Sequence, residues 1–240
     1  MISELTPAGA EWAAGLMERR RREYERYSPV FWRPAEGVTD LHARFLRRQL
    51  SSGQVIALRS SHGFIICQRR QPEGFVDDFA VEPPVTWDGD GAALLLAAAQ
   101  RLAADGIAAV RVVTAHADDM KAGMLSSLSL SVAEQWWVRE LVPAGQPQAP
   151  GRINGPGFSG LLTPAPPVYD PGGPVFQPDR MTPQATAEEI ARTAAAYGAV
   201  LAVIAAAPGT DRARELDASG WSVASDWYLG WPLAVPSPIA

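Results

Sequence analysis

Two glycines, Gly89 and Gly91, stand between a strand-like segment and a helix-like segment, and that arrangement can bind an anion. Residues 75–81 alternate in the manner of a strand that is buried on both faces. Two prolines end that strand, and the loop WDGDG at residues 87–91 leads into a run rich in Ala and Leu. A strand, a glycine loop and a helix in this order present free backbone N–H groups to an anion. We therefore expect a pyrophosphate there, and an ordinary glycine loop before a core helix is the alternative.

Two well-known phosphate-binding patterns do not match this loop. The Walker pattern is absent because no Gly-Lys-Ser/Thr follows the loop, and the only lysine in the sequence is Lys121. The dinucleotide fingerprint also fails, since Leu94 stands where a third small residue is needed. No acidic residue near Arg111 can take the ribose.

The remaining pattern resembles the Gcn5-related N-acetyltransferase (GNAT) superfamily. Its loop reads Arg/Gln-x-x-Gly-x-Gly/Ala after a strand that ends in a hydrophobic residue, any residue and Val. Residues 86–91, TWDGDG, keep both glycines at that spacing and place Thr86 at the Arg/Gln position. Residues 77–81, DDFAV, look like the family's acidic-Asp-aromatic-x-Val strand. The resemblance covers Thr6 to Val142.

The resemblance implies acetyl-CoA (coenzyme A) as the cofactor and a small-molecule or peptide amine as the acceptor. The pyrophosphate would contact backbone amides in the loop, and the pantetheine would lie along the end of the preceding strand. The residues that the resemblance places around the cofactor are Phe79, Ala80, Val81, Thr86, Asp88, Gly89, Asp90, Gly91 and Ala92.

Acetyl transfer to an amine also needs a base that removes a proton from the ammonium. The candidates are Asp77, Asp78 and Glu82, because neighbouring carboxylates in a partly buried strand raise one another's pKa. Strand alternation turns Asp77 and Asp78 to opposite sides, and the family's strand register favours Asp77. In the family, the loop between the first two helices lines the acceptor pocket. Phe31 and Trp32 are the pocket candidates by that resemblance, with core aromatics as the alternative.

Two departures from the family pattern support a second hypothesis. Asp88 and Asp90 put negative charge beside a loop that should bind phosphate, at a cost of about 1 kcal/mol per close pair. Leu125 stands where the family often has a tyrosine that protonates the leaving thiolate. The chain can therefore also be a catalytically degenerate GNAT-like module that binds acyl-CoA or a protein partner.

Composition excludes several other classes. The 240 residues carry a net charge of −5, which argues against nucleic acid or an anionic membrane as the main partner. No apolar run is long enough to span a bilayer, and the N-terminus lacks a secretory signal, so we expect a cytoplasmic protein. With Cys67 as the single cysteine, no internal disulfide is possible and we expect no metal site.

Periodicity predicts a mixed α/β fold with a mixed sheet (α+β) for residues 1–142, the order found in the GNAT fold. The predicted helices are 6–27, 38–50, 92–105 and 118–127. The predicted strands are 54–59, 63–70, 74–81, 109–114 and 130–141.

Beyond residue 142 the sequence first becomes rich in Pro and Gly and then repeats itself. We expect residues 143–178 to be a linker without regular structure. Ser131–Trp137 is echoed by Ser222–Tyr228, and at the same spacing Lys121 corresponds to Arg212. Residues 179–240 therefore predict a partial second GNAT-like β-α-β unit without a glycine loop or the three antiparallel strands. Such a half must dock on residues 1–142 or on another subunit, which makes a monomer with pseudo-dimeric halves or a homodimer.

Overall fold

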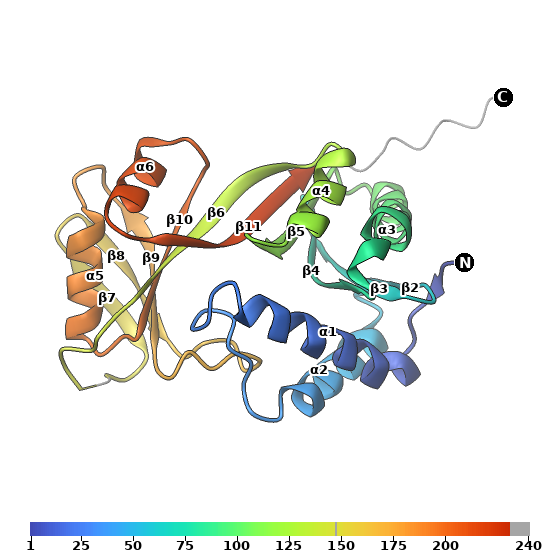
Figure 1. Ribbon diagram of the computed structural model, residues 1–240, viewed down its shortest axis with the longest axis horizontal. Coiled ribbons are helices and arrows are strands. Elements are labelled where there is room, and N and C mark those ends of the chain that lie inside the picture. Colours follow the sequence, from blue (N-terminus) through green and yellow to red (C-terminus); the bar gives the residue numbers. More distant parts are fainter. Residues whose placement is uncertain (147, 231–240) are drawn as a thin grey trace. The chain divides into compact units, whose positions relative to one another are not determined.

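The computed structural model describes residues 1–146 and 148–230 (Figure 1). The helices expected in the first 142 residues are confirmed, with small shifts at their ends. They are α1 (Ala10–Glu25), α2 (Val38–Ser52), α3 (Ala92–Ala104) and α4 (Asp119–Ser127). The expected strands are also confirmed, as β2 (Val55–Arg59), β3 (Gly63–Arg70), β4 (Glu73–Val81), β5 (Ala109–Ala115) and β6 (Ser131–Glu140). A two-residue strand, β1 (Ser3–Glu4), precedes them.

The chain divides into two compact units whose boundaries do not follow the predicted ones. The first unit contains Met1–Arg20, Thr39–Ala133 and, within the described residues, 227–230. The second unit contains Arg21–Val38 and Glu134–Asp226. Each unit thus combines segments that are far apart in the sequence.

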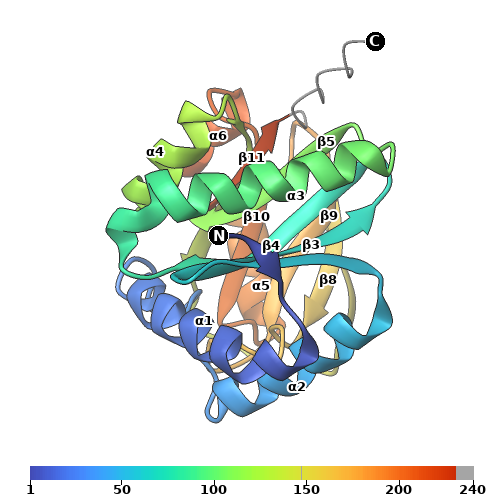
Figure 2. The same cartoon turned by 90° about the vertical axis from the view of Figure 1, so that its right-hand side faces the viewer.

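The first unit is a sheet covered by helices on both faces. Its strand order is β1-β2-β3-β4-β5, followed by the end of β11 (Ser222–Gly230). Neighbours from β1 to β4 are antiparallel, whereas β4 and β5 are parallel. Figure 2 shows α3 and α4 on one face of these strands and α1 and α2 on the other. The apolar positions of α3 recur at helical spacing and are buried against the sheet; they include Leu94, Leu95, Ala98 and Leu102.

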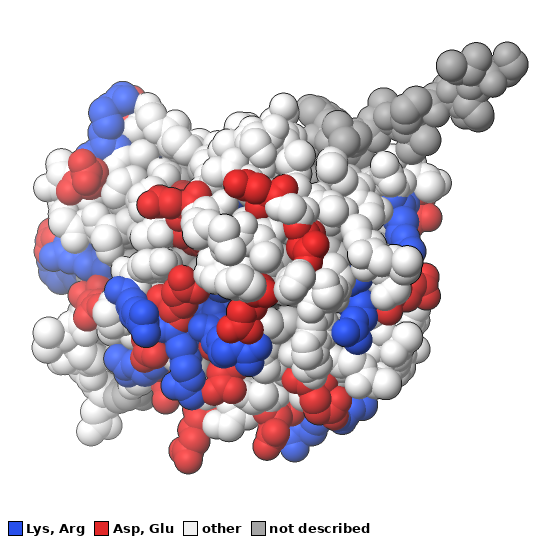
Figure 3. Space-filling view, turned by 45° about the vertical axis from the view of Figure 1, so that its right-hand side comes forward, with Lys and Arg blue, Asp and Glu red and all other residues white. Residues whose placement is uncertain are grey.

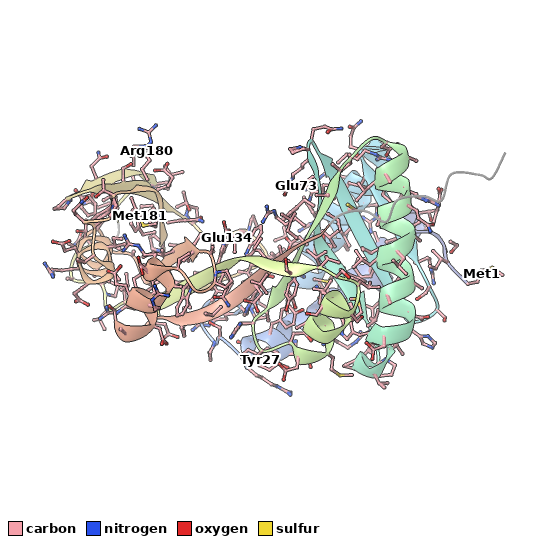
Figure 4. The ribbon with its side chains drawn as sticks, turned by 90° about the horizontal axis from the view of Figure 1, so that it is seen from above. Met1, Tyr27, Glu73, Glu134, Arg180 and Met181 are labelled. Carbon is pink, nitrogen blue, oxygen red and sulfur yellow. The ribbon has the colours of Figure 1, made fainter. Side chains whose placement is uncertain are left out.

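The second unit contains three antiparallel strands that the sequence did not predict. They are β7 (Gly151–Gly155), β8 (Phe158–Thr163) and β9 (Val175–Met181). The prediction of a structureless linker over 143–178 is therefore wrong for these strands, as is the prediction that the second copy lacks them. Arg180 and Met181, at the end of β9, are labelled in Figure 4.

The prolines and glycines of this segment led to the prediction of a linker. Two of them, however, have a specific structural reason to be in a strand. A Cβ on Gly160 would lie 2.4 Å from the carbonyl oxygen of Gln177, so the close approach of β9 requires glycine at this point of β8. Pro178 faces Gly160 where the register of the β8–β9 ladder shifts. A proline is tolerated at such an irregularity, although it counts against a strand when only the sequence is read.

After β9 the second unit continues with α5 (Ala187–Ala196), β10 (Leu201–Ala206), α6 (Asp211–Ala218) and β11. β10 is parallel to β9, as β5 is to β4. The element order from β7 to β11 therefore repeats the order from β2 to β6.

The final strands of the two repeats are exchanged. β6 follows α4 in the chain, yet it pairs antiparallel with β10, from Leu201 opposite Glu140 to Ala206 opposite Gln135. β11 follows α6 but lies next to β5 in the strand order. Each repeat thus supplies the strand that extends the sheet of the other.

Candidate functional site

The candidate site lies where β4 and β5 separate. The parallel ladder between them runs from Glu73 opposite Ala109 to Val76 opposite Val112 and then ends, although both strands continue. Glu73, labelled in Figure 4, anchors the start of this ladder, and its carboxylate accepts a hydrogen bond of 2.7 Å from Nε of Arg111. We call the part beyond Val76 and Val112 the β4–β5 divergence. Backbone groups that leave a ladder in this way need other partners, which makes such a place suitable for an extended ligand.

A β-bulge in β4 lies at the start of the divergence. Ile65 pairs with Phe79 and Cys67 pairs with Val76, so two residues of β4, Asp77 and Asp78, oppose the single residue Ile66. Asp77 is exposed and Asp78 is buried, which agrees with the expectation that they face opposite ways. Bulges of this kind re-aim side chains next to functional sites.

The three candidate bases have different surroundings. Oδ1 of Asp78 lies 3.0 Å from Nε2 of His42, and both side chains are buried. Glu82 is an exposed partner of Arg19, with an N–O distance of 2.5 Å. Asp77 and Glu82 are therefore exposed, whereas Asp78 is buried.

A buried lysine occupies the β4–β5 divergence. The ammonium of Lys121, on α4, donates a hydrogen bond of 2.8 Å to the carbonyl oxygen of Val113, the first residue of β5 beyond the ladder. The same nitrogen lies 5.2 Å from the ring centre of Phe79 on β4 and 5.4 Å from that of Trp87. Lys121 is 1% exposed. One cation therefore contacts both separated strands and the segment that leads into α3.

Lys121 belongs to a network of buried charges. Asp118 is the N-cap of α4 and accepts from the backbone N–H of Lys121, while its other oxygen accepts from Arg20 and Thr114. The guanidinium of Arg20 also lies over the Trp87 ring, 5.4 Å from its centre. Burial lowers the pKa of Lys121 to about 8, and the charge of Asp118 opposes that shift. Because Asp118 serves both cations, its removal would leave Arg20 and Lys121 buried without this carboxylate.

The predicted glycine loop is helical. Trp87–Gly91 forms a π-helical turn that continues directly into α3, and the backbone N–H of Ala92 donates to the carbonyl oxygens of Gly89 and Trp87. The amide of Ala92 is therefore used within the helix, whereas binding of a pyrophosphate by this turn stays a prediction. The positive end of the helix lies earlier, near Thr86, whose hydroxyl donates to the carbonyl oxygen of Pro83.

Gly91 is required by packing. A Cβ at this position would lie 2.6 Å from Cε3 of Trp87, whose indole is fully buried. Trp87 packs edge-on against Phe79 with ring centres 4.8 Å apart. Gly89 is different, because nothing lies within 4 Å of a Cβ built there. The packing of Trp87 thus requires glycine at residue 91 but not at residue 89. The spacing of the two glycines in the sequence could not distinguish these situations.

The carboxylates of this turn do not favour an anion. Asp88 is exposed, and Asp90 contacts Nδ1 of His62 at 2.7 Å and accepts from the Ser60 hydroxyl at 2.9 Å. Desolvation raises the pKa of Asp90, but these hydrogen bonds outweigh it and hold the pKa below its ordinary value. Asp90 therefore stays charged at neutral pH beside the expected phosphate position.

These residues do not fit acyl-CoA in the predicted manner. Phe79, Ala80 and Val81 are buried core residues, and Phe79 is in contact with the Lys121 ammonium and the Trp87 ring. The turn before α3 offers carboxylates where the pyrophosphate should lie. The β4–β5 divergence, which the sequence did not predict, is a place where a cofactor could lie along β4.

The remaining predicted residues are part of the core or belong to the second unit. Leu125 is fully buried, and burial raises the pKa of the Cys67 thiol to about 12, as a core cysteine requires. Trp32 lies in the second unit, where its Nε1 donates to the carbonyl oxygen of Ala224 at 3.0 Å and its ring packs on Phe31. Trp32 is thus a core aromatic. Within residues 1–146 and 148–230, no three His, Cys, Asp or Glu side chains form a group that could hold a metal ion.

The second unit has a counterpart of Lys121. Arg212 of α6 donates 2.7 Å and 3.2 Å hydrogen bonds to the carbonyl oxygens of Ala185 and Thr182, which precede α5. Its guanidinium also pairs with Glu215, whose carboxylate accepts from the backbone N–H of Ala187 in the first turn of α5. In both units a cation from the helix after the parallel strand donates to backbone carbonyl oxygens, of β5 in the first unit and of the segment before α5 in the second.

Comparisons with known proteins establish the fold. No protein-family model and no curated protein matches the sequence. A GCN5-related N-acetyltransferase from Sphaerobacter thermophilus matches with a TM-score of 0.58 and 10% identity, over 96% of this chain and 95% of that chain. A putative acetyltransferase from Thermoplasma acidophilum matches with a TM-score of 0.57 and 9% identity, over 96% and 98% of the two chains.

A putative acetyltransferase from Pyrococcus horikoshii gives a TM-score of 0.55 with 13% identity, over 96% of this chain and 89% of that one. The chain therefore has the GNAT fold, and the match includes the second unit. None of the helices in the described part of the chain combines the length and apolarity needed to cross a bilayer.

Proposed function

We propose that this chain is a GNAT-fold binding module that does not transfer acyl groups. The observation that carries this proposal is the hydrogen bond from the Lys121 ammonium to the Val113 carbonyl oxygen inside the β4–β5 divergence. A side chain of the protein takes the backbone acceptor and the ring contacts that an extended cofactor would need.

Displacement of Lys121 would be costly. If its ammonium left, Asp118 would lose a neighbouring cation, and the Phe79 and Trp87 rings would lose a cation that lies within 5.4 Å of both. Leaving the carbonyl oxygen of Val113 without this donor would cost about 1–3 kcal/mol. An acyl-CoA molecule would have to repay that amount while its pyrophosphate approached Asp88 and Asp90.

The surface supports an acidic protein segment as the partner of this module. Arg44, Arg47 and Arg48 are exposed on one face of α2 and surround a shallow hollow with Ser51 and Ser52. Arg47 pairs with Glu11. On the face drawn in Figure 3, basic and acidic side chains are interspersed. Arg44 and Arg48 lie one helical turn apart on α2 and bring two positive charges together. Titration with poly-glutamate should show binding that falls with salt and is lost in Arg44→Glu/Arg48→Glu.

A second candidate function is transfer of an acetyl group from acetyl-CoA to an amine. The β4–β5 divergence favours it, as does Asp77, an exposed carboxylate at the bulge that could accept a proton from the acceptor ammonium. The similar solved structures described as acetyltransferases, two of them putative, support the same candidate. In this case the side chain of Lys121 must leave the divergence before the cofactor enters.

Isothermal titration with acetyl-CoA decides between the two candidates. We expect no heat of binding and no thiol release across a panel of primary amines. Thiol release by the unmodified protein would overturn the lead proposal, and the loss of that release in Asp77→Asn would establish the second candidate. Lys121→Met is the matched control, because it keeps the volume of the side chain but removes its charge and its hydrogen bond.

A further inference from the structure

The second unit contains a pocket that the GNAT-fold site does not use. Its volume is about 480 Å³, which is in the range that binds small organic molecules. The described residues that line it are Ala35, Gln148, Pro150, Leu162, Thr163, Pro164, Ala165, Tyr169, Asp170, Pro171, Gly173 and Pro174. All of them belong to the second unit.

The wall of this pocket is fixed by backbone hydrogen bonds. Pro34 and Tyr169 form an isolated antiparallel bridge, and the N–H of Ala35 donates to the carbonyl oxygen of Val168 at 3.1 Å. The N–H of Asp170 donates to the carbonyl oxygen of Arg33 at 2.9 Å. The ring of Tyr169 packs against Trp32 with centres 5.4 Å apart. A pocket held in this way is formed before a ligand arrives, which reduces the entropy lost on binding.

The lining presents both hydrogen-bond acceptors and donors, the donors being the side chains of Gln148, Thr163 and Tyr169. Its prolines have a carbonyl oxygen but no N–H, and the carbonyl oxygen of Pro174 already accepts from the N–H of Val200 at 2.9 Å. No Lys, Arg or His is among the described lining residues, and their one carboxylate is Asp170. An anion would therefore find neither a cation nor a row of amides there. A ligand that donates hydrogen bonds and carries positive charge would find both a carboxylate and carbonyl oxygens.

Asp170 is held in position by its own turn. Its Oδ1 accepts a hydrogen bond of 2.9 Å from the backbone N–H of Gly172, and the side chain is exposed to solvent. Gly172 has a φ of +89°, so this turn depends on glycine. Asp170 is the one charged residue among the described residues that line this pocket, and a single carboxylate suits one ammonium group.

We propose that this pocket binds a small molecule with an apolar body and a primary ammonium group. The apolar part lies against the proline, alanine and leucine side chains, and the ammonium pairs with Asp170. This site is independent of the β4–β5 divergence. A test of the pocket therefore does not depend on whether the proposed function is correct.

The test compares three probes of similar shape: phenethylammonium, 2-phenylethanol and 3-phenylpropanoate. We expect the ammonium to bind about two- to fivefold more tightly than the alcohol, as an ion pair with an exposed carboxylate allows, and the carboxylate not to bind. Isothermal titration and chemical shifts of Tyr169 and Ala165 provide the readout. Equal affinity for the ammonium and the alcohol, or no binding of any probe, would overturn the proposal.

Two variants and one control sharpen the result. Asp170→Asn keeps an oxygen for the Gly172 N–H but removes the charge, so the ammonium should lose its advantage while the alcohol binds as before. Ala165→Trp should fill the pocket and remove binding of both. Asp217→Asn, an exposed carboxylate on α6 of the same unit, should change nothing. A loss of ammonium binding in the Asp217 control would mean that general surface charge explains the effect, which would overturn the proposal.

Discussion

The indole of Trp87 occupies the space that a Cβ on Gly91 would need, with only 2.6 Å between that position and Cε3. The glycine that most resembles a cofactor-binding residue is therefore set by a core tryptophan. This relationship leads to the first prediction.

Gly91→Ala should destabilise the protein by about 1–3 kcal/mol, because the added methyl group forces the buried Trp87 ring to move. Gly89→Ala is the matched control in the same turn. A methyl group at residue 89 has open space around it. This substitution should leave the free energy of unfolding unchanged or raise it by up to about 1 kcal/mol, since alanine is preferred in helical turns. Urea unfolding monitored by tryptophan fluorescence measures both. Equal effects of the two substitutions would contradict the packing explanation.

The second prediction concerns the pH dependence that Lys121 confers. Its pKa falls from 10.5 to about 8 in the folded protein, so between these values the unfolded chain binds a proton that the folded protein does not. The free energy of unfolding should therefore contain a contribution that rises with pH from about 8 to 10.5 and is lost as the pH falls through about 8.

Lys121→Met removes this titration and keeps an apolar side chain of similar length. The difference in unfolding free energy between parent and variant, measured at about pH 7 and about pH 10, should shift in favour of the parent at the higher pH. A difference that does not change with pH would show that the folded protein does not depress the pKa of Lys121.

The two aspartates of the β4 bulge should respond differently to replacement. Asp78→Ala removes a buried partner of His42 and should cost about 1–3 kcal/mol. Asp77 is exposed, so the free energy of unfolding of Asp77→Ala should stay within about 0.5 kcal/mol of the parent value. Thermal and urea unfolding measure both changes. A larger loss of stability in Asp77→Ala than in Asp78→Ala would contradict the bulge, because it would mean that Asp77 is the buried residue.

In the second unit, Arg212 should matter more than Arg214 on the same helix. Arg212→Ala removes the donor to the carbonyl oxygens of Ala185 and Thr182, and the start of α5 should exchange its amide hydrogens faster. Arg214→Ala removes an exposed pair with Asp211 and should leave exchange in α5 unchanged. Hydrogen exchange with mass spectrometry distinguishes them. Unchanged protection in Arg212→Ala would contradict a supporting role for its guanidinium.

The sequence predicted the first repeat well because its elements follow simple periods. The apolar positions of α3 recur at helical spacing, and Gly106 and the paired prolines mark the ends of segments. β8 and β9 could not be found in this way, since Gly160 and Pro178 are usual signs of a loop. Their presence follows from a close approach between two backbones, which only the folded chain shows.

The site was harder to predict than the fold. Spacing identified Gly89 and Gly91 but could not tell which one a buried ring requires. Two features of the sequence distinguished Lys121: it is the only lysine, and it corresponds to Arg212 in the repeat. Its role depends on Phe79 and Val113, which come from two other strands, so no local pattern could reveal that its charge is buried.

The exchange of β6 and β11 has a consequence for the way the chain is made. A domain usually folds once its last residue has left the ribosome, and synthesis proceeds at about 5–20 residues per second. The first unit begins at Met1 but includes Trp227–Gly230, so its sheet must wait for the segment that follows α6. During that interval the open edge of β5 is exposed in the nascent chain. Chaperone binding during translation should therefore concentrate on the early part of the sequence and end only when β11 emerges.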